Sequence, residues 1–127
     1  MAIVGLGLDL VEIERVRALI ERRGERALER LFTEGERAYC ERRGPGRFAS
    51  YAGRFAVKEA TMKLLGTGWA RGVRWIDLEV VRASGRAPEL VLHGASARIA
   101  TSKGIARIHV TITHDAGIAA AVAVAES

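Results

Sequence analysis

The spacing of hydrophobic residues along this chain changes between a period near two and a period near 3.6. Residues 2–13 are apolar on both faces for most of their length, which predicts a buried first strand. Residues 12–32 then place apolar side chains at helical spacing, and we expect Gly24 to divide this segment into two helices. Thr33 and Glu36 have the spacing of a capping box, so a third helix is expected to begin there.

A longer helix is predicted for residues 47–65, after the Gly-Pro-Gly break at 44–46. Its apolar stripe repeats at intervals of three and four residues, and one carboxylate, Glu59, lies on that stripe. Gly66 stands where a C-cap glycine ends a helix.

The remainder of the chain returns to alternation. We expect strands at 74–83 and 89–94 with a turn at 84–88, a short helix at 95–104, and strands at 107–113 and 118–126 joined by a hairpin turn with His114 and Asp115. This order predicts an α+β fold, with a mainly antiparallel sheet packed against a long helix and shorter helices. The length fits one domain spanning residues 1–127.

Composition narrows the class of protein. Hydrophobic residues make up 49% and charged residues 28%, as in globular rather than disordered chains. No apolar run approaches the ~20 residues that span a bilayer, and the N-terminus lacks the basic region of a secretory signal, so we expect a cytoplasmic protein. Cys40 is the single cysteine, which excludes a disulfide framework and a cysteine zinc site.

The net charge of +5 is concentrated in the first part of the chain, where residues 15–47 hold ten Arg and six Glu. One interpretation is a solvated helix face with i,i+4 pairs. The other is a docking surface for an acidic partner, such as a nucleic acid, a membrane surface or an acidic protein.

Two carboxylates stand in apolar surroundings, Asp9 on the first strand and Glu59 on the long helix. A structural interpretation makes Asp9 a helix cap and pairs Glu59 with Lys63, which is worth only ~0.3–0.5 kcal/mol on an exposed helix. The alternative is a site for a hard divalent ion such as Mg²⁺, which needs only one or two protein carboxylates besides phosphate oxygens.

The residues around Glu59 favour a phosphate ligand. The chain has three Lys against 17 Arg, and two of the three, Lys58 and Lys63, flank Glu59. Both are compact charges suited to phosphate oxygens, and Arg54 can add a forked donor. Gly66, Thr67 and Gly68 would let backbone approach a ligand.

His114 and Asp115 admit two interpretations. Both residue types are common in turns, but an imidazole there could also move a proton or contact phosphate. His109, inside an alternating strand, is expected to be structural.

Four segments together resemble the holo-acyl-carrier-protein synthase family, the small phosphopantetheinyl transferases. They are GLGLDLVEIERV (5–16), FTEGERAYC (32–40), RFAVKEATMKLLGTG (54–68) and VTITHDAGIAAAVAV (110–124). The resemblance covers essentially the whole chain. It implies transfer of 4′-phosphopantetheine from coenzyme A to a serine of an apo-acyl carrier protein, with release of adenosine 3′,5′-bisphosphate, as a step of fatty acid biosynthesis.

The same resemblance assigns roles to residues. Asp9 and Glu59 would hold Mg²⁺ on the pyrophosphate, and Lys63 would contact phosphate. Arg54 and His114 would bind coenzyme A phosphates, together with Lys58 and the 66–68 turn. The general base would be Glu59 through a water, or His114 with Asp115, and the sequence leaves this choice open.

The resemblance also implies partners. Family members form homotrimers whose sites are shared between subunits, and their basic first helix docks the acidic carrier protein. Arg15, Arg22 and Arg26 are the candidate docking residues here.

The competing hypothesis is a small basic binding module without catalysis. Against a nucleic-acid partner, aromatic residues are only 6% of the chain and no nucleic-acid motif is present.

Overall fold

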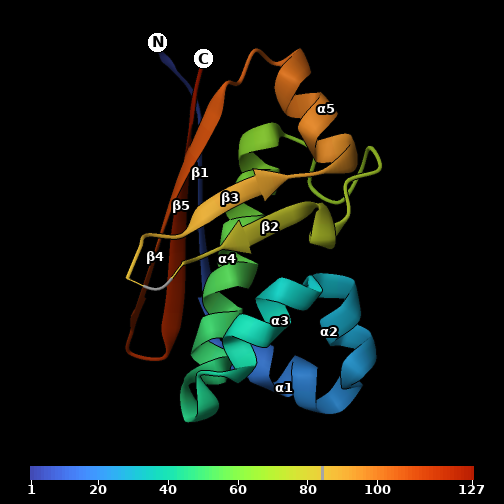
Figure 1. The fold of residues 1–127 in the computed structure, drawn as a ribbon, viewed down its shortest axis with the longest axis vertical. Helices are drawn as coiled ribbons and strands as arrows, with labels where there is room; N and C mark the ends of the chain where they lie inside the picture. The colour runs from blue at the N-terminus through green and yellow to red at the C-terminus, as the bar shows by residue number, and fades with distance from the viewer. Residues whose placement is uncertain (84) are drawn as a thin grey trace.

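The structure, a computed structural model, describes residues 1–83 and 85–127. Its elements have the order expected for an α+β protein (Figure 1). The strands are β1 (Ile3–Glu12), β2 (Leu78–Val81), β3 (Glu89–Leu92), β4 (Arg107–Asp115) and β5 (Ile118–Glu126). The helices are α1 (Ile13–Arg23), α2 (Glu25–Leu31), α3 (Glu34–Glu41), α4 (Arg47–Leu65) and α5 (Gly94–Ser102), with 3-10 turns η1 (Gly44–Gly46) and η2 (Trp75–Asp77).

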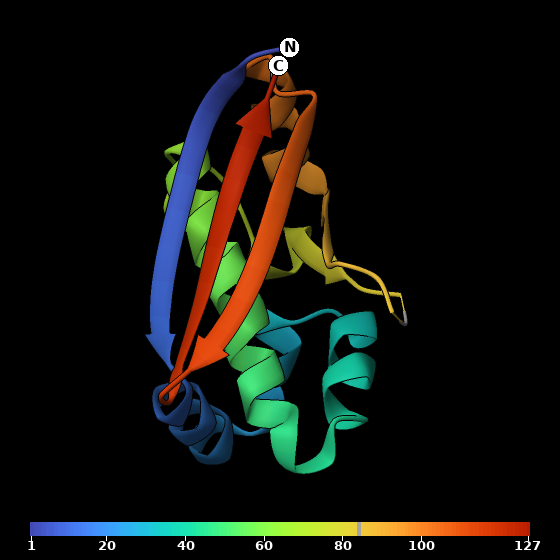
Figure 2. The same cartoon turned by 90° about the vertical axis from the view of Figure 1, so that its left-hand side faces the viewer.

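Helix α4 is the centre of the molecule. The strands β1, β5 and β4 form an antiparallel sheet in that order, and α4 packs along its inner face. The antiparallel ribbon β2–β3 and the helices α1 and α3 cover the other sides of α4 (Figures 1 and 2). The expected architecture, an antiparallel sheet against one long helix, is confirmed.

The inner face of the sheet is built from small residues, which bring α4 close to the strands. On β5 the inward positions are alanine from Ala119 to Ala125, and all are buried. On β1 a Cβ added at Gly7 would overlap the carbonyl oxygen of Ala60 in α4. Glycine is therefore required where the helix meets the strand backbone.

The outer face of the sheet is apolar along β1 and open in the single chain. Leu6, Leu8 and Leu10 keep exposed fractions of 66%, 57% and 66%. The register places Leu6 beside Val124 and Leu8 beside Val122 of β5, so the apolar surface spans two strands. The first strand was expected to be buried on both faces, but within one chain only its inner face is covered.

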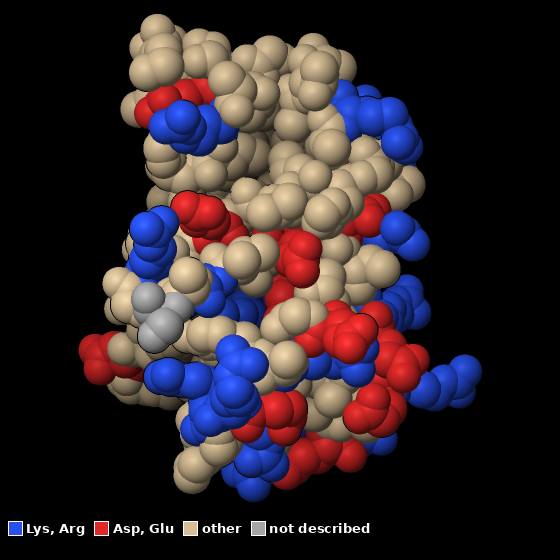
Figure 3. Space-filling model, viewed as in Figure 1, with Lys and Arg blue, Asp and Glu red and all other residues tan. Residues whose placement is uncertain are grey.

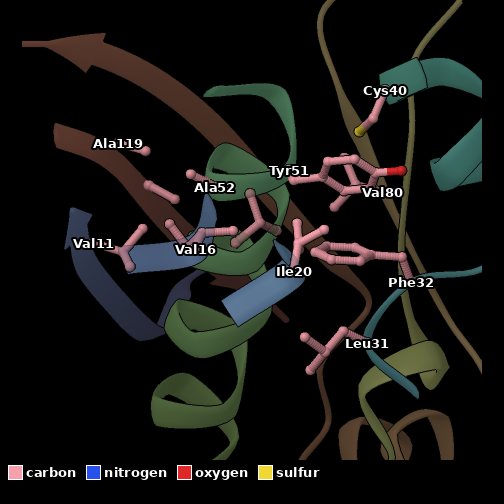
Figure 4. Packing of buried hydrophobic residues seen from close by; sticks show 13 residues of the cluster. Val11, Val16, Ile20, Leu31, Phe32, Cys40, Tyr51, Ala52, Val80 and Ala119 are labelled. Atoms are coloured by element: carbon pink, nitrogen blue, oxygen red, sulfur yellow. The ribbon is translucent and has the colours of Figure 1, made fainter. Parts of the chain in front are cut away.

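Two apolar clusters hold α4 in place. The larger one joins α1, α3, α4, β2 and the sheet around the tilted rings of Phe32 and Tyr51, whose centroids are 4.8 Å apart (Figure 4). The second joins the C-terminal half of α4 to α5 through Met62, Leu65 and Ile99. Because α4 is packed at both ends, the position of Glu59 on it is fixed.

The local signals for helix ends are confirmed. Gly24 separates α1 from α2 with φ 63. Thr33 and Glu36 form both hydrogen bonds of the capping box that begins α3. Gly66 ends α4 in the left-handed conformation, with φ 74.

Two expectations for the second half need correction. The predicted strand at 74–83 begins later, because η2 occupies residues 75–77 and β2 spans Leu78–Val81. His114 and Asp115 belong to β4, and the turn consists of Ala116 and Gly117 with φ 50 and 77. Two positive φ values at the centre of a two-residue turn match the twist of the hairpin. The turn predicted at 84–88 includes position 84, which lies outside the described residues.

Candidate active site

The carboxylate of Asp9 lies where β1 meets α4. Its side chain is only 13% exposed, although it belongs to an edge strand. The Nζ of Lys63 donates to Asp9 Oδ1 at 3.0 Å and to the carbonyl oxygen of Leu8 at 3.1 Å. The close contact at Gly7, one inward position earlier on β1, lets the two side chains meet across 54 positions of sequence.

Glu59 lies one helical turn before Lys63 and is half-buried. The structural interpretation paired these two residues, but the ion pair that the structure gives Lys63 is with Asp9. Burial raises the pKa of Glu59 above its ordinary 4.5, and the charge of Asp9 raises it further, while Lys63 and Arg15 lower it. Asp9 and Glu59 therefore lie close enough to repel each other.

This pair of carboxylates fits a divalent cation. A cation between them would remove the repulsion, and carboxylate oxygens are the ligands that Mg²⁺ prefers. Over residues 1–83 and 85–127, no three His, Cys, Asp or Glu side chains gather as a metal cluster. A cation at Asp9 and Glu59 would thus need further oxygens from water or from a phosphate ligand.

Lys58 does not face this site, which corrects its assignment as a phosphate ligand. Its side chain has no exposed surface, and its Nζ donates to Glu36 Oε1 at 2.8 Å. It also donates to the carbonyl oxygens of Trp75 at 3.0 Å and Leu78 at 2.7 Å. Three acceptors use all three ammonium hydrogens, so Lys58 has a structural role in joining α4 to α3, η2 and β2.

The partner of Lys58, Glu36, has a role that the sequence only partly indicated. Besides capping α3, its Oε2 accepts from the backbone N–H of Val80 at 2.8 Å. Burial lowers the pKa of Lys58, and the Glu36 charge opposes that shift. The spacing of Thr33 and Glu36 indicated the helix cap. Nothing in the sequence indicated the ion pair between Glu36 and Lys58.

Arg54 is almost completely buried and has spare donors. Its Nη1 donates to Ser50 Oγ at 3.0 Å, but Nε and Nη2 have no hydrogen-bond partner among residues 1–83 and 85–127. Its guanidinium lies over the Tyr39 ring at 4.1 Å. Buried, unpaired guanidinium nitrogens suit an anionic ligand.

Two further cations surround the same ring, and sequence reasoning missed them. The guanidinium carbons of Arg42 and Arg43 lie 5.8 and 6.0 Å from the centroid of Tyr39. The cation–π contacts gather them beside Arg54. The signal available in the sequence was the pair of arginines that follows the third helix.

His114 reaches the N-terminal half of α4. Its Nε2 lies 2.8 Å from the carbonyl oxygen of Ala49, so this nitrogen carries the proton in that bond. A Cβ at Gly53 would lie 2.8 Å from Ile112 Cγ2 and 3.1 Å from the same nitrogen, so glycine lets both side chains of β4 pack closely on α4. Asp115 is the next residue of β4 and points to the opposite face of the sheet. The hypothesis of a His114–Asp115 proton relay is therefore not supported.

The expected site residues form two groups within one chain. Asp9, Glu59 and Lys63 lie at the β1 edge of the sheet, whereas Arg54 and His114 lie toward β4. β5 separates these edges, which places them about 10 Å apart in the plane of the sheet.

The glycine-rich turn follows α4 directly. Thr67 is buried and its N–H donates to the carbonyl oxygen of Met62 at 3.2 Å, while Gly66 and Gly68 are exposed. Both glycines have positive φ. The turn thus presents backbone near the C-terminal end of the helix that carries Glu59 and Lys63.

The basic surface expected on the first helices is present. Arg15 and Arg22 on α1 and Arg26 on α2 are exposed. Arg15 is close enough to Glu59 to lower the pKa of that carboxyl. Charged groups of both signs are interleaved over the part of the molecule that contains α1–α3 (Figure 3).

Comparison with known proteins identifies the family of this chain. Residues 5–123 match the model of the 4′-phosphopantetheinyl transferase superfamily. The chain is 46% identical to a holo-[acyl-carrier-protein] synthase of Solibacter usitatus, over 98% of this chain and 99% of the relative. It is 50% identical to one from an Anaeromyxobacter species, over 98% and 96%.

Solved structures of the same kind of enzyme share the fold. The holo-[acyl-carrier-protein] synthase of Neisseria meningitidis superposes with a TM-score of 0.88 at 27% identity, over 99% of this chain and 100% of that one. The Helicobacter pylori enzyme, in complex with coenzyme A, superposes with a TM-score of 0.82 at 30% identity, over 95% and 99%.

The family decides between the two hypotheses of function. A binding module without catalysis would not be expected to match these enzymes over its full length. No helix in the described part of the chain is long and apolar enough to cross a membrane. The chain belongs to the 4′-phosphopantetheinyl transferase superfamily as a holo-[acyl-carrier-protein] synthase, the enzyme that transfers phosphopantetheine from coenzyme A to an apo-acyl carrier protein.

Proposed function

We propose that the whole chain, residues 1–127, is one transferase domain whose reaction centre is the group Asp9, Glu59 and Lys63. The observation that carries this proposal is the pair of neighbouring carboxylates on β1 and α4 with one ammonium beside them. Phosphoryl transfer depends mainly on positioning and charge neutralisation, and these residues supply both.

In this proposal Asp9 and Glu59 hold Mg²⁺, which neutralises charge on the pyrophosphate of coenzyme A. Lys63 balances the charge of Asp9 in the free chain. Because its side chain is 57% exposed, it can turn from Asp9 to a phosphate oxygen when the cation binds. The 66–68 turn lies beside the bound coenzyme.

The bond changes are a single substitution at phosphorus. The serine oxygen of the carrier protein bonds to the phosphorus next to the pantetheine arm, and the bond from that phosphorus to the adenosine 3′,5′-bisphosphate oxygen breaks. Glu59 accepts the serine proton through a water, because it is the candidate base that lies at the carboxylate pair. His114 instead contributes with Arg54 to binding of coenzyme A phosphates.

The proposal includes a homotrimer with shared sites. The two groups of site residues lie at different edges of the sheet in one chain, and the apolar outer face of β1 is exposed. A neighbouring subunit packed on this face would cover the apolar surface and bring its own Arg54 and His114 toward the first subunit's Asp9.

The acidic carrier protein would dock on the basic surface of α1 and α2. Reversing the charge of Arg22 and Arg26 to Glu should raise the KM for the carrier protein about tenfold and flatten its dependence on salt. Binding of coenzyme A should not change, since both residues lie away from the carboxylate pair. Equal weakening of both ligands would contradict a dedicated docking surface. Arg15 is less suitable for this test because it influences Glu59 directly.

The test of the reaction is mass spectrometry of an apo-carrier protein incubated with this chain, Mg²⁺ and coenzyme A. A gain equal to one phosphopantetheine on the target serine, abolished by chelation of Mg²⁺, is the expected result. No gain under these conditions would overturn the proposal. A cytoplasmic location and the absence of a nucleic-acid partner stay predictions from the sequence.

A further inference from the structure

A row of three aromatic rings begins on α4 four residues before Glu59, with Phe55 and Trp75 half-buried and Trp69 exposed at its end. Phe55 of α4 stacks on Trp75, with centroids 5.0 Å apart and planes 17° apart. Trp69 follows with its centroid 6.0 Å from that of Trp75. Trp69 is 73% exposed, which is unusual for the largest apolar side chain.

The aromatic row and the carboxylate pair lie along the same side of α4. Phe55, Glu59 and Lys63 follow one another at intervals of four residues, so their side chains are neighbours along the helix surface. Phe55 contacts Trp75 at one end of this series, and Lys63 contacts Asp9 at the other. A ligand on Glu59 is therefore bordered by charges on one side and by aromatic rings on the other.

The segment that carries Trp69 has a defined conformation. It is held at its two ends by Thr67 and Val73, which are both buried. Between them, Gly68, Arg71 and Gly72 all have positive φ. A backbone of this kind folds the segment back toward η2 and holds Trp69 near Trp75, so the exposure of the ring is built into the loop.

We propose that Trp69, with Trp75 beneath it, binds the pantetheine arm of coenzyme A and positions it during transfer. This inference rests on the proposed function. The arm is attached to a phosphate that Asp9 and Glu59 would hold through Mg²⁺, so it must leave the reaction centre along a neighbouring surface. It carries a gem-dimethyl group and two amides, and both groups pack well against indole faces.

The carrier protein is the less suitable occupant of this row. Its acidic surface is complementary to the arginines of α1 and α2. Of those helices, α1 packs on α4 and α2 on η2, whereas the loop that carries Trp69 follows the C-terminal end of α4 (Figure 1). The arm, by contrast, has no charge of its own and needs apolar contact.

The experiment compares two ligands that differ in the arm. Binding of coenzyme A and of adenosine 3′,5′-bisphosphate is measured by calorimetry with Mg²⁺ for the wild-type chain, Trp69→Ala, Trp69→Phe and the control Val91→Ala, which removes another exposed apolar side chain. Trp69→Ala should weaken coenzyme A roughly three- to tenfold and leave the bisphosphate unchanged. Trp69→Phe should recover most of the loss, and Val91→Ala should bind both ligands as the wild type does.

The outcomes separate this inference from the proposed function. Wild-type binding of coenzyme A with no loss in Trp69→Ala would overturn the inference alone, as would equal loss for both ligands. A raised KM for the carrier protein with unchanged coenzyme A binding would assign the row to protein docking and also overturn it. If the wild-type chain bound no coenzyme A and modified no carrier protein, the proposed function would fall.

Discussion

At the residue scale, two lysines of helix α4 have different roles. Lys58 is buried among three acceptors, whereas Lys63 is exposed and contacts Asp9. They are five residues apart, so they project from different sides of α4. One side packs on η2 and β2, and the other borders β1. Of the two lysines, only Lys63 therefore takes part in the ionic chemistry at Glu59.

If Asp9 and Glu59 share one cation, the loss of either should disable the site. Asp9→Asn and Glu59→Gln should each lower kcat/KM by at least about 100-fold, because the amides keep the shape but remove the charge. The double variant should be little worse than either single variant, since the site is already broken. Raised Mg²⁺ should partly rescue each single variant.

The measurement is the Mg²⁺ dependence of the transfer rate for both single variants and the double variant. Glu89→Gln, an exposed carboxylate change on β3, serves as the control. Additive losses, or a fully active Glu59→Gln, would mean that the two carboxylates do not share a metal.

The raised pKa of Glu59 predicts how stability depends on pH in the metal-free chain. The folded state holds this proton to a higher pH than the unfolded state, whose pKa is near 4.5. The unfolding free energy therefore falls as pH rises above 4.5 through the raised pKa. Glu59→Gln removes this cost, so it should have a slightly higher Tm than the wild type at pH 7.

Thermal unfolding at several pH values in the presence of a chelator checks this expectation. The difference in Tm should shrink as pH falls below about 4.5, where Glu59 is protonated in both states. At the same Mg²⁺ concentration, the Tm of the wild type should rise more than that of Glu59→Gln. A variant less stable than the wild type at pH 7 would contradict the expected cost of a charged Glu59 that is half-buried beside Asp9.

At the scale of elements, the contact of β1 with α4 positions the reaction centre. Strand and helix approach until only glycine fits at Gly7. The same contact sets Asp9 beside Lys63 one inward position later. The sequence motif Gly-Leu-Gly-Leu-Asp therefore combines a packing requirement with a functional carboxylate.

Gly7→Ala should separate β1 from α4 and disturb the site. The added methyl group overlaps backbone, which cannot move aside as a side chain could, so we expect a loss of about 1–3 kcal/mol or more in the free energy of unfolding. Transfer activity should fall further than stability alone explains, because Asp9 moves with the strand.

Gly46→Ala is the matched control. Gly46 has φ −84 and nothing within 4 Å of an added Cβ, so the same substitution should be neutral or stabilise by ~0.4–1 kcal/mol. Urea unfolding of both variants measures the change in the free energy of unfolding that each substitution causes. Similar effects at the two glycines would show that the close contact is not the cause.

At the scale of the whole molecule, one chain divides the proposed site between two edges of its sheet. The exposed leucines of β1 form an apolar surface on which a second subunit could pack. The two groups of site residues are separated within one chain, so residues from another subunit would be needed to complete the site. Assembly would thus complete the site as well as bury apolar area.

Complementation between inactive variants tests this directly. Asp9→Asn and His114→Ala should each have little activity alone. When they are unfolded and refolded together in equal amounts, about a quarter of the shared sites should combine an intact Asp9 with an intact His114. Activity should return to about that fraction of the wild type.

The control mixes the two variants after each has refolded separately. Sedimentation equilibrium of the wild type should give three copies per particle. A monomer at micromolar concentration, or a co-refolded mixture no more active than its parts, would rule out shared sites.

The sequence alone determined the local features of this protein. Helix ends at Gly24, Thr33 and Gly66 depend on backbone conformation and short-range hydrogen bonds, which neighbouring residues decide. Periodicity placed the helices and the β4–β5 hairpin for the same reason. Asp9 and Glu59 stood out because carboxylates in apolar stretches need a partner wherever the chain folds.

Only the tertiary structure decided what those residues contact. In the folded chain Lys58 pairs with Glu36, 22 positions away, and Lys63 pairs with Asp9, 54 positions away. Both pairs depend on how α3 and β1 pack around α4. The tertiary structure also gathered Arg42, Arg43 and Arg54 around one tyrosine and set Trp69 beside Trp75. Such contacts follow from packing between elements, which residue spacing along one element does not specify.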